Sequence, residues 1–359
     1  MASQSAPARR SFRTLEGLRA VGAIIIVMRH VPLFGPIRVP ESFLAVDLFY
    51  LISGFVVAHA YEPRLAAGGY FWDFVKVRLI RLYPLYLAGL AVGVVMAIAS
   101  LLQDPDTSWT PTKLAECLAI GLFMIPRFPA LPNNGTTLDG PLWTLLYELI
   151  ANFVYAAGIR FMRVWLLVVV MLASAVGIVL AELTRHTLDV GYNVDDQWAA
   201  LARVGYSFFA GVLIYRLFGQ RERKAPWVAY LCAALLALGL GCHLTNALIA
   251  PFEIGMVLVG MPVIVIAAAH FEPDAPIGRL FSWLGLMSYG VYCLHQPLGN
   301  LVVLEAWDVV PHGLSGIAVG VAFIAAIFLL AWLLDRFYDA PFRGWLRRRL
   351  FPQPRAKAA

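Results

Sequence analysis

Long apolar runs separated by short polar segments recur along the whole chain. A helix needs about 20 mostly apolar residues to cross a bilayer. About ten runs meet that length, at 15–34, 43–62, 78–102, 141–160, 163–182, 198–218, 226–246, 249–270, 281–305 and 314–335. A further apolar run, at 114–126, is shorter. The pattern predicts an all-α fold, a polytopic membrane helix bundle with about ten transmembrane helices.

The composition indicates the same class of protein. Hydrophobic residues make up 60% of the 359 positions and charged residues 14%, against roughly 45–50% and 25% in a soluble domain. The mean hydropathy is +0.74. We therefore expect the membrane bundle to occupy residues 1–340, with no separate soluble domain. The basic start leads into a long span without a small-residue cleavage site, so the first helix is expected to be retained.

Charge and cysteine content argue against nucleic acid, a disulfide framework and a metal site. The formal net charge is +6, but the basic residues form short clusters beside apolar runs. There they set topology and contact anionic lipid head groups rather than nucleic acid. The four cysteines show no metal-type spacing, so neither a disulfide framework nor a metal site is expected.

The positive-inside rule decides whether the short run at 114–126 crosses the membrane. If it crossed, the basic cluster Arg216, Arg221, Arg223 and Lys224 would lie outside, and the acidic loop between Glu182 and Asp196 would lie inside. We therefore expect 114–126 to be a re-entrant or interfacial helix. With ten crossings both termini are cytoplasmic, and residues 341–359 form a basic cytoplasmic tail.

Titratable and charged residues interrupt several of the spans. Such residues cost roughly 2.5–3.5 kcal/mol at the bilayer centre and usually mark a functional cavity. At 1.5 Å of rise per residue, the outer half is predicted to hold His30, Asp47, Glu148 and His295 together, whereas Arg78 and Arg81 lie at the cytoplasmic rim. Two levels of polar residues predict two different roles.

Five ordered blocks resemble the motifs of one membrane enzyme family. They are "LEGLRAVGAIIIVMRHV" (15–31), "VDLFYLISGFVVA" (46–58), "VRLIRLYPLYL" (77–87), "PLWTLLYELIANFVY" (141–155) and "SYGVYCLHQPL" (288–298). In this order they resemble the acyltransferase 3 family, bacterial integral-membrane enzymes that move acyl groups from acyl-coenzyme A to carbohydrates and related acceptors. The chain departs from the family at Arg29, and at Leu149 and Ile150.

The resemblance implies that His30 is the catalytic histidine. An imidazole with a pKa near 6.5 can accept a proton from a hydroxyl group around neutral pH. Glu148 is the second expected catalytic residue, which orients His30, holds the acceptor or shuttles the proton. The alternative for each is a structural one: His30 bonded for helix packing, or Glu148 paired with an arginine for helix association.

Donor binding is expected at the paired arginines. Arg78 and Arg81 are three positions apart and share a helix face, where two guanidinium groups match phosphate oxygens. We expect them to bind the phosphates of acyl-coenzyme A, with Arg19 from the first block. Positive-inside anchoring is the alternative.

Three further residues are candidates for acceptor binding. Asp47 either binds the acceptor or caps its helix. Trp143 stacks on a sugar ring or is an ordinary interfacial tryptophan. His295 hydrogen-bonds the acceptor or is held structurally beside Pro297.

The sequence therefore predicts a membrane-bound O-acyltransferase of the bacterial cytoplasmic (inner) membrane, with acyl-coenzyme A as donor and no metal. An acyl group, acetyl by default for the family, would pass to a hydroxyl group of a carbohydrate, glycolipid or small acceptor at the external side. One alternative is a proton-coupled secondary transporter, in which Glu148, His30 and Arg29 relay protons. The other is a non-catalytic scaffold.

Overall fold

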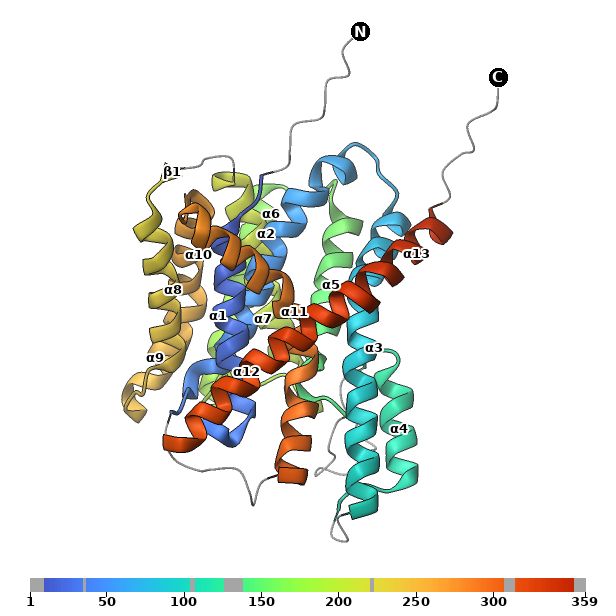
Figure 1. The fold of residues 1–359 in the computed structure, drawn as a ribbon. Helices are drawn as coiled ribbons and strands as arrows, with labels where there is room; N and C mark the ends of the chain where they lie inside the picture. Colours follow the sequence, from blue (N-terminus) through green and yellow to red (C-terminus); the bar gives the residue numbers. More distant parts are fainter. Residues whose placement is uncertain are drawn as a thin grey trace, which may run out of the picture.

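The computed structural model of the chain is a bundle of long helices that pack side by side (Figure 1). It describes residues 10–34, 37–103, 107–125, 138–219, 223–306 and 314–351. The first half contains α1 (Arg13–His30), α2 (Ala45–Ala66), α3 (Phe71–Gln103), α4 (Pro111–Gly121), α5 (Trp143–Gly158) and α6 (Val164–Arg185). The second half contains α7 (Gln197–Phe218), α8 (Pro226–Gly241), α9 (Asn246–Gly255), α10 (Met261–His270), α11 (Ala275–Ala306), α12 (Leu314–Leu334) and α13 (Ala340–Leu350).

Short elements join and extend these helices. Single turns of 3-10 helix are η1 (Pro32–Phe34), η2 (Pro40–Leu44), η3 (Gly140–Leu142) and η4 (Val194–Asp196). Two π-helical turns, η5 (Met256–Gly260) and η6 (Asp335–Asp339), link α9 to α10 and α12 to α13. The strands β1 (Arg223–Lys224) and β2 (Phe271–Glu272) pair in parallel, with Arg223 opposite Phe271.

The predicted all-α bundle is confirmed. Each predicted span coincides with one helix or with two consecutive helices. Within the described ranges, six helical segments are long and apolar enough to cross a membrane, at 40–66, 71–103, 164–185, 194–218, 247–270 and 315–350. Helix α1 has 18 residues but carries four charged side chains: Arg13, Glu16, Arg19 and Arg29.

The short run predicted at 114–126 lies within and after α4. This helix has 11 residues, which at 1.5 Å per residue is about 16 Å and too short to cross a bilayer. The hydroxyl groups of Tyr83 and Tyr86 in α3 donate to the carbonyls of Leu122 and Gly121 at its end. Helix α4 therefore packs beside one end of α3, as expected for a helix that does not cross (Figure 1).

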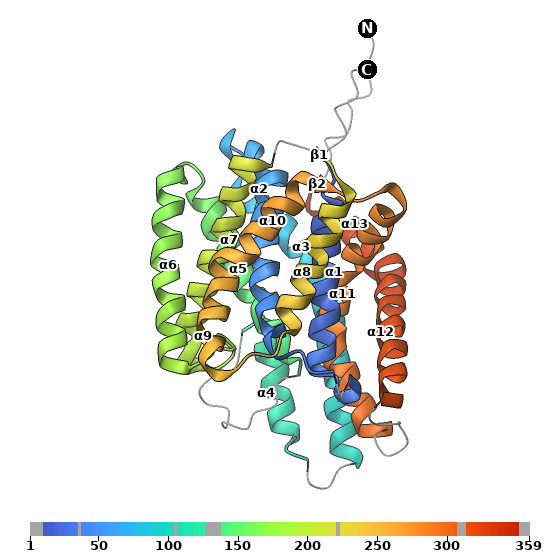
Figure 2. The same ribbon diagram turned by 90° about the vertical axis from the view of Figure 1, so that its left-hand side faces the viewer.

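The start of α1 and the end of α13 lie at the same end of the bundle (Figure 1). The start of α3, the start of α6 and strand β1 also lie there. These elements carry or adjoin most of the basic clusters of the sequence, and we call this end of the molecule the basic end. Helices α4 and α9 mark the opposite end (Figure 2).

The helices differ in how much of their surface the bundle covers. The apolar windows of the segments that contain α2 and α7 are 67% and 72% buried, against 17% for α6 and 22% for the segment that contains α12. Helices α6 and α12 lie at opposite sides of the bundle (Figure 2). Apolar side chains that remain exposed on these two helices are suited to contact lipid.

Two glycines allow α2 and α7 to touch backbone to backbone. A Cβ atom added at Gly54 would lie 1.9 Å from the carbonyl oxygen of Phe208, and one added at Gly211 would lie 2.0 Å from that of Leu51. Small residues at such positions let membrane helices approach closely, which increases dispersion contact where no hydrophobic force drives association. The α2–α7 seam therefore requires glycine at both positions.

The basic segment predicted to follow the last span begins as a helix. Helix α13 continues α12 through η6 and carries Arg343, Arg347, Arg348 and Arg349. The rest of the predicted tail, 352–359, lies outside the described residues. So do Pro126, the last residue of the short run, and Arg221 of the basic cluster.

A substitution in the α2–α7 seam tests this packing. Gly54→Ala should lower the free energy of unfolding by roughly 1–3 kcal/mol, because the new methyl group overlaps a backbone oxygen. Gly255→Ala is the matched control, since no atom of the described residues lies within 4 Å of its added Cβ. Thermal unfolding of the detergent-solubilised protein, followed by size-exclusion chromatography, measures both. Equal stability of the two variants would show that the seam has room for a side chain.

Candidate active site

A cavity of about 730 Å³ lies among α1, α3, α4, α11 and the segment before α5. We call it the histidine chamber, because His30, the last residue of α1, lies in its wall. Helix α1 begins at the basic end, so the chamber lies toward the opposite end. The other wall residues used below are Arg29, Val46, Asp139, Trp143, Asp189, Arg203 and Tyr292.

His30 contacts a second histidine from α11. The Nε2 atom of His295 lies 3.1 Å from Nδ1 of His30, and the ring centroids are 5.1 Å apart. Nδ1 of His30 also lies 3.1 Å from the carbonyl oxygen of Ile26, one turn earlier in α1. The helix and His295 thus hold one edge of the His30 ring, and the ring itself borders the cavity.

Arg29 turns away from His30 although the two residues are consecutive. Its guanidinium group pairs with Asp189, which comes from the segment between α6 and η4. It also donates to the carbonyl oxygen of Pro40 at 3.1 Å and lies 5.4 Å from the ring centroid of Phe43. Arg29 therefore ties the end of α1 to two loops at the rim of the histidine chamber.

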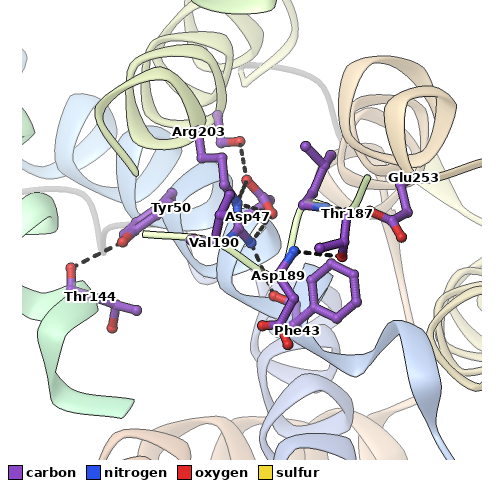
Figure 3. A network of polar contacts seen from close by, with 11 residues as sticks. Phe43, Asp47, Tyr50, Thr144, Thr187, Asp189, Val190, Arg203 and Glu253 are labelled. Carbon is purple, nitrogen blue, oxygen red and sulfur yellow. Dashed lines mark hydrogen bonds and ion pairs between the residues drawn. The ribbon is translucent and has the colours of Figure 1, made fainter. Parts of the chain in front are cut away.

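Asp47 forms a buried ion pair with Arg203 of α7 (Figure 3). Arg203 Nη2 lies 2.6 Å from Asp47 Oδ2, and the two residues are only 1% exposed. The same guanidinium group donates to the carbonyl oxygens of Val190 and Phe43, at 3.0 and 3.1 Å. No side-chain hydrogen bond from Asp47 caps α2. Asp47 thus joins α2 to α7, and it is Arg203 that borders the chamber.

Trp143 borders the histidine chamber at the start of α5. Its ring meets that of Tyr147 edge to face, with centroids 5.5 Å apart. Gly191 lies against it: a Cβ there would be 2.7 Å from the Trp143 ring, and the φ of +115° also requires glycine. The indole is therefore held in one orientation, as a stacking surface must be.

A second cavity, of about 260 Å³, lies among α1, α2, α3, α5 and α11. We call it the arginine chamber, because Arg19, Arg78 and Arg81 line it together with Glu16 and Glu148. Three arginines and two glutamates give these lining residues a formal net charge of +1. The three arginines predicted for the donor site thus lie together.

Glu148 lies in the arginine chamber and pairs with Arg78. Its Oε1 atom lies 2.8 Å from Arg78 Nη2 and 2.6 Å from the hydroxyl oxygen of Ser53. Arg78 is only 8% exposed and is not at a solvated rim. The predicted depths of both residues are corrected: Glu148 is level with Arg78, and its observed contacts are not with His30.

The path of the chain before α5 explains this difference in depth. The carbonyl oxygen of Leu138 packs so closely on α3 that a Cβ at Gly93 would lie 2.3 Å from it. Gly93 is in the interior of α3. The segment 138–142 therefore re-enters the bundle, and α5 begins inside it rather than at its edge. Counting residues down from an edge placed Glu148 too far from the basic end.

Arg81 and Arg19 keep more of their surface free than Arg78. Arg81 lies 3.9 Å from Asp339, and Arg19 lies 3.3 Å from Glu16. The two arginine side chains are 26% and 25% exposed, against 10% for Arg78. Arg81 and Arg19 therefore present accessible donors in this chamber, whereas Glu148 and burial hold Arg78 in place.

The two chambers adjoin inside the bundle. Val46 of α2 and Tyr292 of α11 line both cavities. The hydroxyl group of Tyr292 lies 2.8 Å from that of Thr144 and 2.7 Å from the carbonyl oxygen of Pro141. Tyr292 thus stands between the cavities, anchored at the start of α5.

The sequence analysis did not select Arg203 or Asp139 as site residues, although both line the histidine chamber. Arg203 is a lone arginine within a predicted span, a signal of the kind that selected Arg29. Asp139 precedes the Trp143 block, and neither oxygen of its buried carboxyl group has a hydrogen-bond partner in the part of the chain that the structure describes. Only the re-entry of its segment brings Asp139 beside the chamber. Among the described residues, no group of three or more His, Cys, Asp or Glu side chains is arranged to hold a metal ion.

Comparisons with known proteins identify the family of the chain. The family model described as an acyltransferase domain matches residues 12–336, so the chain belongs to the acyltransferase 3 family. A curated relative, "Protein 2 in picA locus" of Rhizobium radiobacter, is 40% identical over 166 residues, which are 43% of this chain and 84% of the relative. No solved structure matches the chain.

Breaking the buried Asp47–Arg203 pair should destabilise the protein. Asp47→Leu should lower the free energy of unfolding by roughly 3–5 kcal/mol, because it leaves the Arg203 charge buried without its counter-ion. The double variant with Arg203→Leu should recover much of that loss. The measurement is thermal unfolding in detergent.

The exposed pair Lys76–Asp73 provides the control. Its side chains are 44% and 49% exposed, so Asp73→Asn should change the stability by less than about 1 kcal/mol. An Asp47→Leu protein that is as stable as Asp73→Asn would contradict a structural role for the buried pair.

Proposed function

We propose that this member of the acyltransferase 3 family transfers an acyl group, in the first instance acetyl, from acyl-coenzyme A to a hydroxyl group of a carbohydrate or related acceptor. The observation that carries the proposal is the pair of adjoining chambers. One contains arginines suited to a phosphorylated donor, and the other contains a histidine suited to act as a base. Val46 and Tyr292 border both chambers, so donor and acceptor can meet inside the bundle.

The donor would enter from the basic end. The positive-inside rule makes this end cytoplasmic, where acyl-coenzyme A is available, in a bacterial cytoplasmic membrane with both termini inside. The accessible guanidinium groups of Arg81 and Arg19 would contact its phosphates through charge-assisted hydrogen bonds. Glu148 would hold Arg78 in position in the same site. This role replaces the catalytic role beside His30 that the sequence predicted.

The acceptor would occupy the histidine chamber, which lies toward the external side in this orientation. Its volume of about 730 Å³ falls within the range of small-molecule sites. Trp143 offers a fixed aromatic face for a sugar ring, and Asp139 and Arg203 border the same space.

The proposed reaction is a direct acyl transfer. His30 accepts the proton of the acceptor hydroxyl group as its oxygen attacks the thioester carbonyl carbon. The new C–O ester bond forms, the C–S bond breaks, and the leaving thiolate takes the proton from His30 to give free coenzyme A. Charge and atoms balance without a metal ion or another reactant.

Substitution of His30 tests the base. His30→Gln should lower the rate of acyl transfer by about 10²- to 10⁴-fold, the usual contribution of a general base. Purified protein in nanodiscs is incubated with labelled acetyl-coenzyme A and a bacterial envelope glycan fraction, and mass spectrometry locates the label. Coenzyme A binding should be unchanged, since Arg19, Arg78 and Arg81 line the other chamber. An active His30→Gln protein would exclude His30 from this role.

Substitution of Arg81 tests the donor site separately. Arg81→Ala should weaken coenzyme A binding by about 10- to 150-fold, because a hydrogen bond to a charged group contributes roughly 1.5–3 kcal/mol. Lys76→Ala is the control, since Lys76 is an exposed neighbour in the same helix that pairs with Asp73, and it should change binding by less than about 3-fold. Isothermal titration with coenzyme A measures both. Equal effects of the two variants would place the phosphates elsewhere.

A further inference from the structure

The contacts of His30 and His295 decide which ring nitrogen of each residue carries hydrogen. Nδ1 of His295 lies 2.8 Å from the carbonyl oxygen of Tyr292 and 3.2 Å from that of Val291. A carbonyl oxygen can only accept a hydrogen bond. Nδ1 of His295 is therefore the protonated nitrogen, and in the neutral ring Nε2 carries the lone pair.

The same reasoning applies to His30. Its Nδ1 lies 3.1 Å from two acceptors, the carbonyl oxygen of Ile26 and Nε2 of His295. Both contacts require a hydrogen atom on Nδ1 of His30. In the neutral ring, its Nε2 therefore carries the lone pair that can accept a proton.

We infer that His295 is a positioning residue for the base: it accepts the Nδ1–H of His30 and thereby fixes the orientation and tautomer that make His30 Nε2 the proton acceptor. This inference rests on the proposed function for its role in catalysis. In this inference His295 hydrogen-bonds His30 and not the acceptor. The arrangement has the logic of a catalytic triad, in which a third group holds the base.

Both ring nitrogens of His295 are already engaged by contacts within the protein. The residue is 0% exposed, and its contacts with carbonyl oxygens and His30 occupy both ring nitrogens. The charged groups near His30 point elsewhere: Arg29 pairs with Asp189, and Arg203 pairs with Asp47. Among the described residues, His295 is thus the side chain that hydrogen-bonds the His30 ring.

The contact also favours the protonated form of His30 during the reaction. When His30 accepts the hydroxyl proton, its Nδ1–H becomes the donor of a charge-assisted hydrogen bond to His295. Such bonds are about twice as strong as neutral ones. His295 would therefore stabilise the developing imidazolium more than the resting imidazole, which is the condition for a catalytic effect.

The test compares two substitutions of His295 with a matched one elsewhere. His295→Leu removes the acceptor, whereas the side-chain oxygen of His295→Gln can still accept the Nδ1–H of His30. His270 of α10 is the control, because its Nδ1 also contacts a carbonyl oxygen of its own helix, that of Ile266 at 2.7 Å. His270→Leu therefore removes a similar intrahelical contact without touching His30.

The expected kinetic result separates positioning from packing. His295→Leu should lower kcat by at least about 100-fold, as loss of the group that orients a catalytic histidine does, with the KM for acetyl-coenzyme A unchanged. His295→Gln should recover at least about 10-fold of that loss, and His270→Leu should resemble the unmodified protein. Equal losses in the Leu and Gln variants, or none in the Leu variant, would overturn the inference.

A second measurement does not depend on acyl transfer. The chain has seven histidines, so ¹⁵N NMR of the histidine-labelled protein can assign His30 and His295 by substitution. Both rings should show protonated Nδ1 and unprotonated Nε2, and the Nδ1 signal of His30 should shift in His295→Leu. A His30 ring protonated at Nε2, or insensitive to His295→Leu, would overturn the histidine pair. If the NMR spectra show the expected tautomers but the protein transfers no acyl group, the proposed function is rejected and the contact between the two histidines is retained.

Discussion

Pairing of buried charges is the constraint on which this structure depends. A charge inside a helix bundle in a membrane is costly unless a counter-ion or hydrogen bonds accompany it. Asp47 meets Arg203 and Glu148 meets Arg78 inside the bundle, and the more exposed Arg29 meets Asp189, in each case across a long stretch of sequence. These pairs join α2 to α7, α3 to α5, and α1 to the segment after α6. These pairs stabilise charged side chains around the two polar cavities, while the Asp139 carboxyl group in the histidine chamber has no hydrogen-bond partner among the described residues.

The close contacts between helices bring the paired side chains within reach of each other. Glycines bring α2 and α7 into backbone contact, and that contact sets the short distance at which Asp47 reaches Arg203. A similar close approach, at Gly93, brings the segment before α5 into the bundle, and Glu148 reaches Arg78 from that starting point. The close approach of these backbones therefore determines where the cavities form. It also determines which polar side chains come together to line them.

Hydropathy and charge were enough to predict the helices and most of the residues of interest. Spans depend on local composition, and a polar residue in a span is conspicuous, so His30, Arg78, Arg81, Glu148 and His295 could be selected from the sequence. Their grouping could not, because partners such as Asp47 and Arg203, 156 positions apart, meet only in the fold. Glu148 was assigned to the level of His30 because residue counting assumes that a helix starts at the membrane edge. The spacing of residues could not predict the contact of His295 with His30, since the two are 265 positions apart.

The backbone contact between α2 and α7 also limits how the protein can move. Carriers that work by alternating access rock one half of the bundle against the other around a central site. Here Gly54 and Gly211 interlock two central helices at van der Waals distance, and a buried ion pair joins the same helices. Sliding or rotation at this seam would break both. Helices α2 and α7 are therefore expected to move as one unit, so any change of shape in this protein would have to occur outside this seam.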